Sequence, residues 1–203
     1  ALTAPEVISL QVFRDLFAAA TLRPGDEAGV SQVALLFSDL QGSTALYERV
    51  GDSVAYNMVR DHFALLAGIV RDRDGAVVKT IGDAVMASFG DPAQAVQAAL
   101  AMQAAIADHD LVLKIGVHAG ASVVVTLNDR LDYFGSTVNM AARLQGQSEG
   151  GDIVLSRAVA DDPAVQPLLA AVPKRDESVT LKGFDRPVPF VRLAPSGLRP
   201  PPP

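Results

Sequence analysis

The stretch that decides the fold is VVKTIGDAVMA, which occupies residues 77–87. Its two apolar halves flank Gly82-Asp83, and such a pair is typical of a tight turn between antiparallel strands. The stretch therefore predicts a β-hairpin with Asp83 at its tip. Lys79 lies inside a strand that reads as buried, so its ammonium group must either reach solvent or meet an acceptor.

A second carboxylate stands at the end of the preceding predicted strand, VALLFSD, at residues 33–39. A loop then opens a predicted helix, with Ser43 or Thr44 as its cap, and exposed backbone amides at such a helix start favour phosphate oxygens. Asp39 and Asp83, delivered by neighbouring strands, would form an oxygen-rich site that suits Mg²⁺ holding a polyphosphate. Taken singly, either aspartate is equally compatible with an ordinary turn.

The composition is that of a globular chain of 203 residues, 49% hydrophobic and 20% charged, which is enough for one domain with a sizeable core. A net charge of −6 argues against binding to nucleic acid or to anionic membranes, since both require a basic face. The absence of cysteine excludes disulfides, thiolate zinc sites and cysteine nucleophiles. No apolar run approaches the roughly 18 residues of a membrane span, and no signal-peptide pattern opens the chain. We expect no membrane insertion and a cytoplasmic location.

Hydrophobic periodicity and turn residues predict the remaining elements. An amphipathic helix is predicted over residues 5–20, followed by a linker with proline and glycine over residues 22–29. Asp91 and Pro92 are predicted to start the helix that follows the hairpin. The other helices and strands are predicted as helices at 44–72, 92–108 and 135–147 and strands at 111–117, 122–126, 130–134, 153–155, 179–181 and 188–193, with a mixed helix and loop at 157–176.

The order strand, helix, hairpin, helix, strand predicts an α+β fold with a ferredoxin-like βαββαβ core and a C-terminal α/β extension. We expect the helices to lie on one face of a mostly antiparallel sheet. The predicted organisation is a helical lead-in over residues 1–30, one globular unit over residues 31–193 and a Pro-rich extended tail over residues 194–203. The lead-in helix either packs on the globular unit or connects it to an upstream regulatory domain. The first residue is not Met, which suggests a piece of a longer signalling protein.

Five segments resemble the catalytic domain of class III nucleotidyl cyclases, the adenylate and guanylate cyclases, in family order. They are LFSDLQGST (36–44), KTIGD (79–83), KIGVHAG (114–120), GSTVNMAARL (135–144) and LKG (181–183). One segment alone would be a weak signal, but five in order over residues 33–193 are specific. The resemblance implies the class III cyclase fold, with residues 31–193 as the catalytic domain. It also implies a phosphorus–oxygen lyase that forms a 3′,5′-cyclic nucleotide and pyrophosphate.

The resemblance implies that Asp39 and Asp83 bind two divalent cations, Mg²⁺ or Mn²⁺, and that the backbone carbonyl of Leu40 joins them. The two ions would activate the ribose 3′-hydroxyl and hold the triphosphate. Asn139 and Arg143 match the pair that positions the ribose and stabilises charge in the transition state. They are four residues apart and therefore share a helix face; a helix-surface pair without function is the alternative.

Base recognition is implied for Lys79 and Asp132, and their identities resemble adenylate cyclases, because guanylate cyclases tend to carry Glu and Cys there. Adenine offers an amino donor to a carboxylate and a ring nitrogen to an ammonium group. Guanine would confront the carboxylate with a second acceptor and leave buried groups unpaired. The alternative is a Lys79–Asp132 ion pair with a structural role. The remaining predicted substrate contacts are Lys182, Gly42, Ser43 and Thr44.

Three positions qualify the resemblance. The segment between Gly120 and Gly135 is shorter than the family pattern, with VVVTL at residues 123–127 in place of a glycine-containing turn, and Asp132 is placed by counting back from Gly135 without a gap. Ser43 stands where the family has Phe, a variation that we associate with bacterial members. His118 falls in a matching motif, but we assign it no chemistry.

In this family one protomer supplies the metal-binding aspartates, and its partner supplies the base-reading residues with the Asn and Arg. This chain carries both sets, so the resemblance implies a homodimer with two shared active sites. The favoured function is an adenylate cyclase acting on ATP. The alternatives are a guanylate or pyrimidine-nucleotide cyclase, a catalytically silent nucleotide-binding sensor domain, and a nucleotidyltransferase with a linear product. The last would require neither the Asn139–Arg143 helix nor the Lys79–Asp132 pair.

Overall fold

The computed structural model describes residues 7–8, 10–17, 27–107, 111–127 and 130–195. Parts of the predicted lead-in helix and linker, and most of the predicted Pro-rich tail, lie outside these residues. The elements in chain order are α2 (Gln11–Phe17), β1 (Glu27–Leu40), α3 (Ser43–Val50), α4 (Asp52–Arg71), β2 (Gly75–Ile81), β3 (Ala84–Phe89), α5 (Pro92–Ile106), β4 (Leu113–Leu127), β5 (Arg130–Phe134), α6 (Ser136–Gln145), β6 (Ile153–Ser156), α7 (Arg157–Ala160), α8 (Gln166–Leu169), β7 (Lys174–Val179) and β8 (Val188–Leu193).

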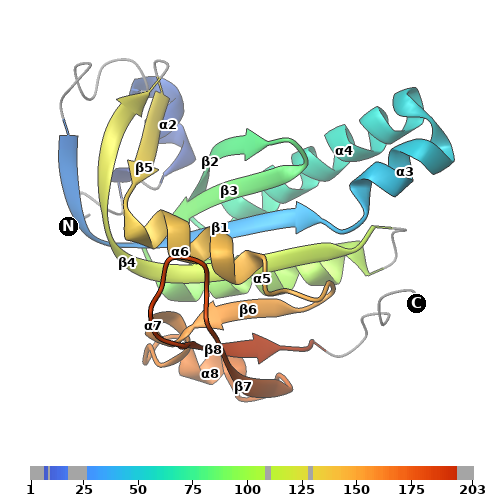
Figure 1. Ribbon diagram of the computed structural model, residues 1–203. Coiled ribbons are helices and arrows are strands. Elements are labelled where there is room, and N and C mark those ends of the chain that lie inside the picture. The colour runs from blue at the N-terminus through green and yellow to red at the C-terminus, as the bar shows by residue number, and fades with distance from the viewer. Residues whose placement is uncertain (1–6, 9, 18–26, 108–110, 128–129, 196–203) are drawn as a thin grey trace.

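One eight-stranded sheet organises the molecule (Figure 1). Its strand order is β2-β3-β1-β4-β6-β8-β7, and β5 pairs with β4 outside this path. The first four strands are antiparallel neighbours and carry the predicted βαββαβ connectivity. β6 joins β4 in parallel, and β8 and β7 complete the extension. The α+β fold and its ferredoxin-like core are therefore confirmed.

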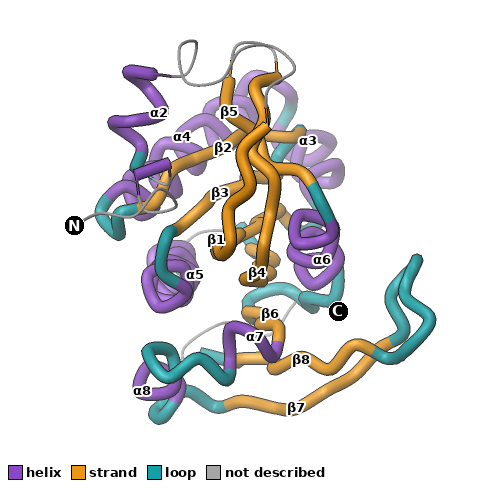
Figure 2. The backbone as a smooth tube through the Cα atoms, turned by 90° about the vertical axis from the view of Figure 1, so that its left-hand side faces the viewer, coloured by secondary structure: helices purple, strands orange, loops and turns teal. Residues whose placement is uncertain are grey.

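Two apolar cores lie on opposite faces of the sheet because the side chains of β1 alternate and both sets are buried. Ala34 and Leu36 belong to the first core, which packs against α4 and α5. Leu35 and Phe37 belong to the second core, which also contains Ala141 of α6. Figure 2 shows α5 and α6 on opposite sides of β1 and β4. The prediction that the helices share one face was wrong, since a strand buried on both faces needs cover on both.

Two predicted segments are arranged differently. The helix predicted over residues 44–72 is divided at Gly51, whose φ of 80° separates α3 from α4. The strands predicted at 111–117 and 122–126 form one continuous strand, β4, because residues 119 and 120 keep pairing with β1. The pairing of β4 with β1 joins residues that are far apart in the sequence, so the residues near 119 and 120 do not indicate that the strand continues.

Element boundaries also differ at three places. β1 begins at Glu27, so residues 27–29 of the predicted linker are paired with β4. Gly42, with φ of 69°, is the N-cap of α3, and no side chain caps this helix; the caps predicted at Ser43 and Thr44 were wrong. β7 occupies residues 174–179, ahead of the strand predicted at 179–181.

The cap predicted for α5 is confirmed, because Ala93 N donates a 2.8 Å hydrogen bond to Asp91 Oδ1. Within the described residues no helix is long and apolar enough to cross a lipid bilayer.

β5 folds back over the second core. β1 and β4 are 14 and 15 residues long, and β5 pairs with the far end of β4. Leu131 and Tyr133 of β5 nevertheless share the second core with Val78 of β2 and Met86 of β3. The curl of the long strands therefore brings β5 against β2, although these strands are not paired with each other.

A glycine lets α6 approach the sheet closely. A Cβ atom built on Gly116 of β4 would overlap the backbone of Leu144 and Gln145 of α6. No residue with a side chain fits there unless the helix moves away. The contact therefore sets the height of α6, and of the side chains it carries, above the sheet.

Gly116→Ala is expected to lower the free energy of unfolding by about 3 kcal/mol, because the added methyl group meets backbone that cannot rotate away. Urea unfolding would measure the change. Gly29→Ala in β1 is the matched control, since its Cβ would meet nothing within 4 Å, and its effect should stay within about 1 kcal/mol. Equal effects of the two changes would contradict a backbone contact at Gly116.

Candidate active site

Two carboxylates meet at one end of the central strands. Asp39 is the penultimate residue of β1, and Gly82, with φ of 62°, turns the hairpin so that Asp83 precedes β3. Burial and the neighbouring charge of Asp83 raise the pKa of Asp39. A hydrogen bond from the Leu40 backbone and the charge of Lys114 act in the opposite direction and offset part of this rise. Asp83 Oδ2 is buried without a hydrogen-bond partner among the described residues. The predicted meeting of these two carboxylates is thus seen in the structure.

Asp39 and Asp83 together have the properties of a cation site. Two partly buried carboxylates repel each other when both are ionised, and an unpartnered buried oxygen is costly unless something binds it. Hard divalent cations accept such oxygens, together with backbone carbonyls such as that of Leu40. Among the described residues no three His, Cys, Asp or Glu side chains gather into a cluster, so the donor set here is two carboxylates and backbone oxygen.

Lys79 is turned toward β5 by a bulge in β2. Val77 pairs with Ala87 and Lys79 pairs with Met86, so Val78 is an extra residue between two pairs. Val78 and Met86 both belong to the second core, and directly paired residues point to the same face of a sheet. Two successive side chains, Val78 and Lys79, therefore point to the same face. Without the bulge, Lys79 would point to the other face.

Lys79 and Asp132 form an ion pair across the gap between β2 and β5. Lys79 Nζ lies 2.6 Å from Asp132 Oδ2, and Tyr133 N donates a 2.8 Å hydrogen bond to Asp132 Oδ1. The Asp132 side chain is 8% exposed and that of Lys79 is 37% exposed. The two predicted base-reading residues are therefore brought together, and each satisfies the other. A purine would have to exchange with this ion pair.

Asn139 and Arg143 lie on the side of α6 that faces away from the sheet, since Thr137, Ala141 and Leu144 are its buried residues. Arg143 is partly buried, and no ion pair within the described residues engages it. Its guanidinium carbon lies 5.9 Å from the ring centre of Phe184. That contact places the segment that includes Lys182, itself exposed, beside α6.

The structure thus brings the predicted residues together in three groups. Asp39 joins Asp83 in the carboxylate pair, and Lys79 joins Asp132 in an ion pair. The third group consists of α6 and the loop between β7 and β8. Within the described residues no hydrogen bond or ion pair joins Arg143 to either aspartate of the carboxylate pair.

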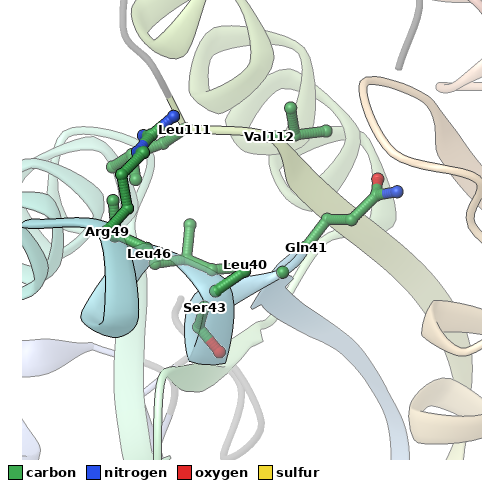
Figure 3. A pocket seen from close by; sticks show the side chains of 9 residues that line it. Leu40, Gln41, Ser43, Leu46, Arg49, Leu111 and Val112 are labelled. Carbon is green, nitrogen blue, oxygen red and sulfur yellow. The ribbon is translucent and has the colours of Figure 1, made fainter. Parts of the chain in front are cut away.

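The loop after β1 borders a cavity of about 310 Å³ between α3 and the start of β4. Figure 3 shows Leu40 and Leu46 at its floor and Arg49 at its rim, while the hydroxyl of Ser43 points away from it. Gly42 and Thr44 are exposed. The Ser43 hydroxyl therefore lies on the side of the loop that faces away from this hollow.

The sequence analysis missed Phe184, Gln11 and Arg14. Phe184 packs against Arg143. The sequence feature that could have identified it is an aromatic residue directly after LKG. Gln11 and Arg14 of α2 contact β2 and β5 beside the Lys79–Asp132 pair; the signal available was two polar residues three apart in an amphipathic helix. His118 stays without assigned chemistry. Burial lowers its pKa to about 4, and its Nδ1 has no partner among the described residues.

Comparison with known proteins relates this chain to nucleotide cyclases. A model of the adenylate and guanylate cyclase catalytic domain matches residues 26–186. An uncharacterized protein of Mycobacterium tuberculosis is 32% identical over 166 residues, which cover 81% of this chain and 42% of that protein. An adenylate cyclase of Mycosarcoma maydis is 32% identical over 181 residues, covering 76% of this chain and 7% of the relative. This chain therefore spans less than half the length of these two relatives.

A solved structure shares the fold. The adenylyl cyclase CyaB from P. aeruginosa superimposes with a TM-score of 0.73 at 24% identity, over 84% of this chain and 97% of that chain.

Proposed function

Because this chain belongs to the adenylate and guanylate cyclase catalytic domain family, we propose that it is an adenylate cyclase that converts ATP to 3′,5′-cyclic AMP and pyrophosphate. The observation that carries the choice of ATP is the Lys79–Asp132 pair, a donor and an acceptor 2.6 Å apart. Adenine presents the complementary acceptor and donor, whereas guanine presents a carbonyl oxygen to the carboxylate. We propose residues 31–193 as the catalytic domain, with residues 1–30 as a lead-in toward a regulatory domain and 194–203 as a tail.

The residues divide the chemistry between them. Asp39, Asp83 and the Leu40 carbonyl hold two divalent cations, Mg²⁺ or Mn²⁺. When bound, these ions supply activation of the ribose 3′-hydroxyl and neutralise the triphosphate. In the reaction the 3′-hydroxyl releases its proton to solvent and its oxygen bonds to the α-phosphorus, while the bond from that phosphorus to the bridging oxygen breaks and pyrophosphate leaves.

The other group binds and orients the substrate. Asn139 orients the ribose, and Arg143 stabilises the charge on the phosphoryl oxygens, since its fork remains charged and meets two oxygens at once. Lys182 and the backbone amides of Gly42, Ser43 and Thr44 hold the triphosphate. The stacking of Arg143 on Phe184 supports this role because it restricts the guanidinium before substrate arrives.

We further propose that the active site is shared between two copies of the chain. One protomer contributes Asp39 and Asp83, and its partner contributes Lys79, Asp132 and the α6 residues. This arrangement is supported by the observation that no hydrogen bond or ion pair joins Arg143 to Asp39 or Asp83 among the described residues of one chain. A homodimer would then contain two equivalent sites.

With equimolar ATP and GTP and saturating Mn²⁺, the protein is expected to form cyclic AMP in at least about tenfold excess over cyclic GMP. Chromatography of the products measures the ratio. The double variant Lys79→Glu/Asp132→Cys should move the ratio toward cyclic GMP, because the carboxylate and thiol suit the guanine edge. Lys174→Glu, an exposed residue of β7, is the matched control and should leave it unchanged.

The outcomes separate the alternatives. Cyclic GMP as the main product of the wild type would keep the cyclase reaction and contradict the proposed reading of Lys79 and Asp132. No cyclic product at any protein concentration, with nucleotide bound, would instead indicate a silent nucleotide-binding domain.

A further inference from the structure

α2 contacts two strands that are not paired with each other. Figure 1 shows α2 beside β5 and β2. Gln11 Oε1 accepts a 2.8 Å hydrogen bond from Val77 N of β2. Arg14 Nη2 donates to the Leu131 carbonyl of β5, and its guanidinium carbon lies 5.6 Å from the ring centre of Tyr133. Residues three apart share one helix face, so a single face of α2 spans the gap between the strands.

Each of these contacts adjoins one member of the Lys79–Asp132 pair. Val77 is the last regularly paired residue before the bulge that turns Lys79 toward β5. Leu131 and Tyr133 are the immediate neighbours of Asp132 in the chain. β2 is the edge strand of the sheet, so Gln11 satisfies a backbone donor that no further strand covers. The helix thus holds the bulge on one side and the backbone of Asp132 on the other.

Arg14 is also an electrostatic neighbour of the pair. It is 6% exposed, and its Nη1 has no hydrogen-bond partner among the described residues. Burial lowers the pKa of Arg14, while Tyr133 and Asp132 act in the opposite direction. Asp132 therefore has a second, buried cation near it in addition to Lys79.

Two hollows border α2. A hollow of about 290 Å³ lies between α2 and β5, and another of about 330 Å³ lies between α2 and α4. Ile8, ahead of α2, packs at the edge of the second core. Among the described residues, the lead-in contacts the rest of the molecule through the polar groups of Gln11 and Arg14 and through Ile8.

From these contacts we propose that α2 is a brace for base recognition, in which Gln11 and Arg14 are positioning residues that set the distance and direction between Lys79 and Asp132. The inference rests on the proposed function of that pair in reading the purine. Docking of α2 then favours selection of ATP, and displacement of α2 weakens it while leaving the carboxylate pair intact. The lead-in is by this account a part of the substrate site and a route by which a preceding domain could act on it.

The test compares Arg14→Met and Gln11→Met with the wild type. Arg14→Met keeps the length of the side chain and removes its donors. We expect KM for ATP to rise about tenfold and the ATP to GTP ratio of kcat/KM to fall about tenfold, with kcat changed less than threefold. Arg14→Lys should recover part of the ratio, since it restores a charge and a donor. Arg60→Met, a half-exposed arginine of α4, is the matched control and should change nothing.

A second readout does not depend on catalysis. Hydrogen exchange of the β2 and β5 amides is expected to speed up at least tenfold in Arg14→Met, with α5 unaffected. An unchanged ATP to GTP ratio despite faster exchange would overturn the proposal, because α2 would then support the fold without setting recognition. Higher activity in the variants would also overturn it, since α2 would then restrain the site.

A wild-type protein without cyclase activity would contradict the proposed function, but it would not by itself decide whether α2 positions Lys79 and Asp132. If the wild type forms no cyclic nucleotide, the stabilisation of the protein by ATP and by GTP with Mn²⁺ decides the proposal on α2. A preference for ATP in the thermal shift that disappears in Arg14→Met would support the brace. A preference that persists, or none in the wild type, would reject it.

Discussion

The Asp83→Asn protein is expected to form cyclic nucleotide about 1000-fold more slowly than the wild type. The amide keeps the size of the side chain but removes one of the two charges that hold the divalent cations, so the electrostatic stabilisation of the reacting phosphate is lost. Initial rates of cyclic AMP formation from ATP with Mn²⁺ would measure the effect. Asp72→Asn, an exposed aspartate at the end of α4, is the control and should retain full activity.

Stability measurements distinguish lost cation binding from damage to the fold. Without metal, Asp83→Asn should unfold at the same temperature as the wild type or higher, because Asp39 and Asp83 repel each other. Addition of Mn²⁺ should raise the unfolding temperature of the wild type, since a ligand that binds the folded state stabilises it. The variant should show little of this rise. An equal rise in both proteins would show that the ions bind elsewhere.

Mixing the inactive Asp39→Asn and Arg143→Ala proteins is expected to restore about a quarter of the wild-type activity. If a dimer shares its sites and the subunits exchange freely, half of the dimers are mixed, and each mixed dimer has one intact site of two. The physical basis is that the carboxylate pair and α6 belong to separate groups within one chain. Cyclic AMP formation in mixtures of varied ratio would measure the recovery.

The matched control uses two defects in the same half of the site. Asp39→Asn mixed with Asp83→Asn should stay inactive, because every site in a mixed dimer then lacks a carboxylate. Recovery in this control would show contamination or reversal rather than sharing. If the first mixture stays inactive while sedimentation shows mixed dimers, the site lies within one chain.

The hairpin and the two acidic strand ends could be predicted because their signals are local. Gly82 adopts a positive φ that glycine takes without strain, and Asp83 follows directly in the sequence. Asp39 is delivered to a strand end because the apolar run of β1 stops there. The same logic placed Asn139 and Arg143 on one face of α6, since helix periodicity fixes which residues are neighbours.

The remainder depends on contacts between distant segments. Nothing near Val78 reports a bulge, because a bulge is defined by the pairing of β2 with β3. The position of α6 follows from Gly116, whose lack of a side chain matters through a helix almost 30 residues later. The contact of Arg14 with Leu131 requires the curl of β1 and β4, which is a property of the whole sheet.

The bulge at Val78 also bears on how this region can change over evolution. Substitutions in β2 alter one side chain at a time and leave the others where they are. A deletion of Val78 would restore strict alternation and leave Lys79 opposite Met86, on the same face as before, but it would remove an apolar side chain from the second core. Lineages of this protein can therefore lose the extra residue of this strand and keep the partner of Asp132, provided that other side chains fill the space that Val78 occupies in the second core.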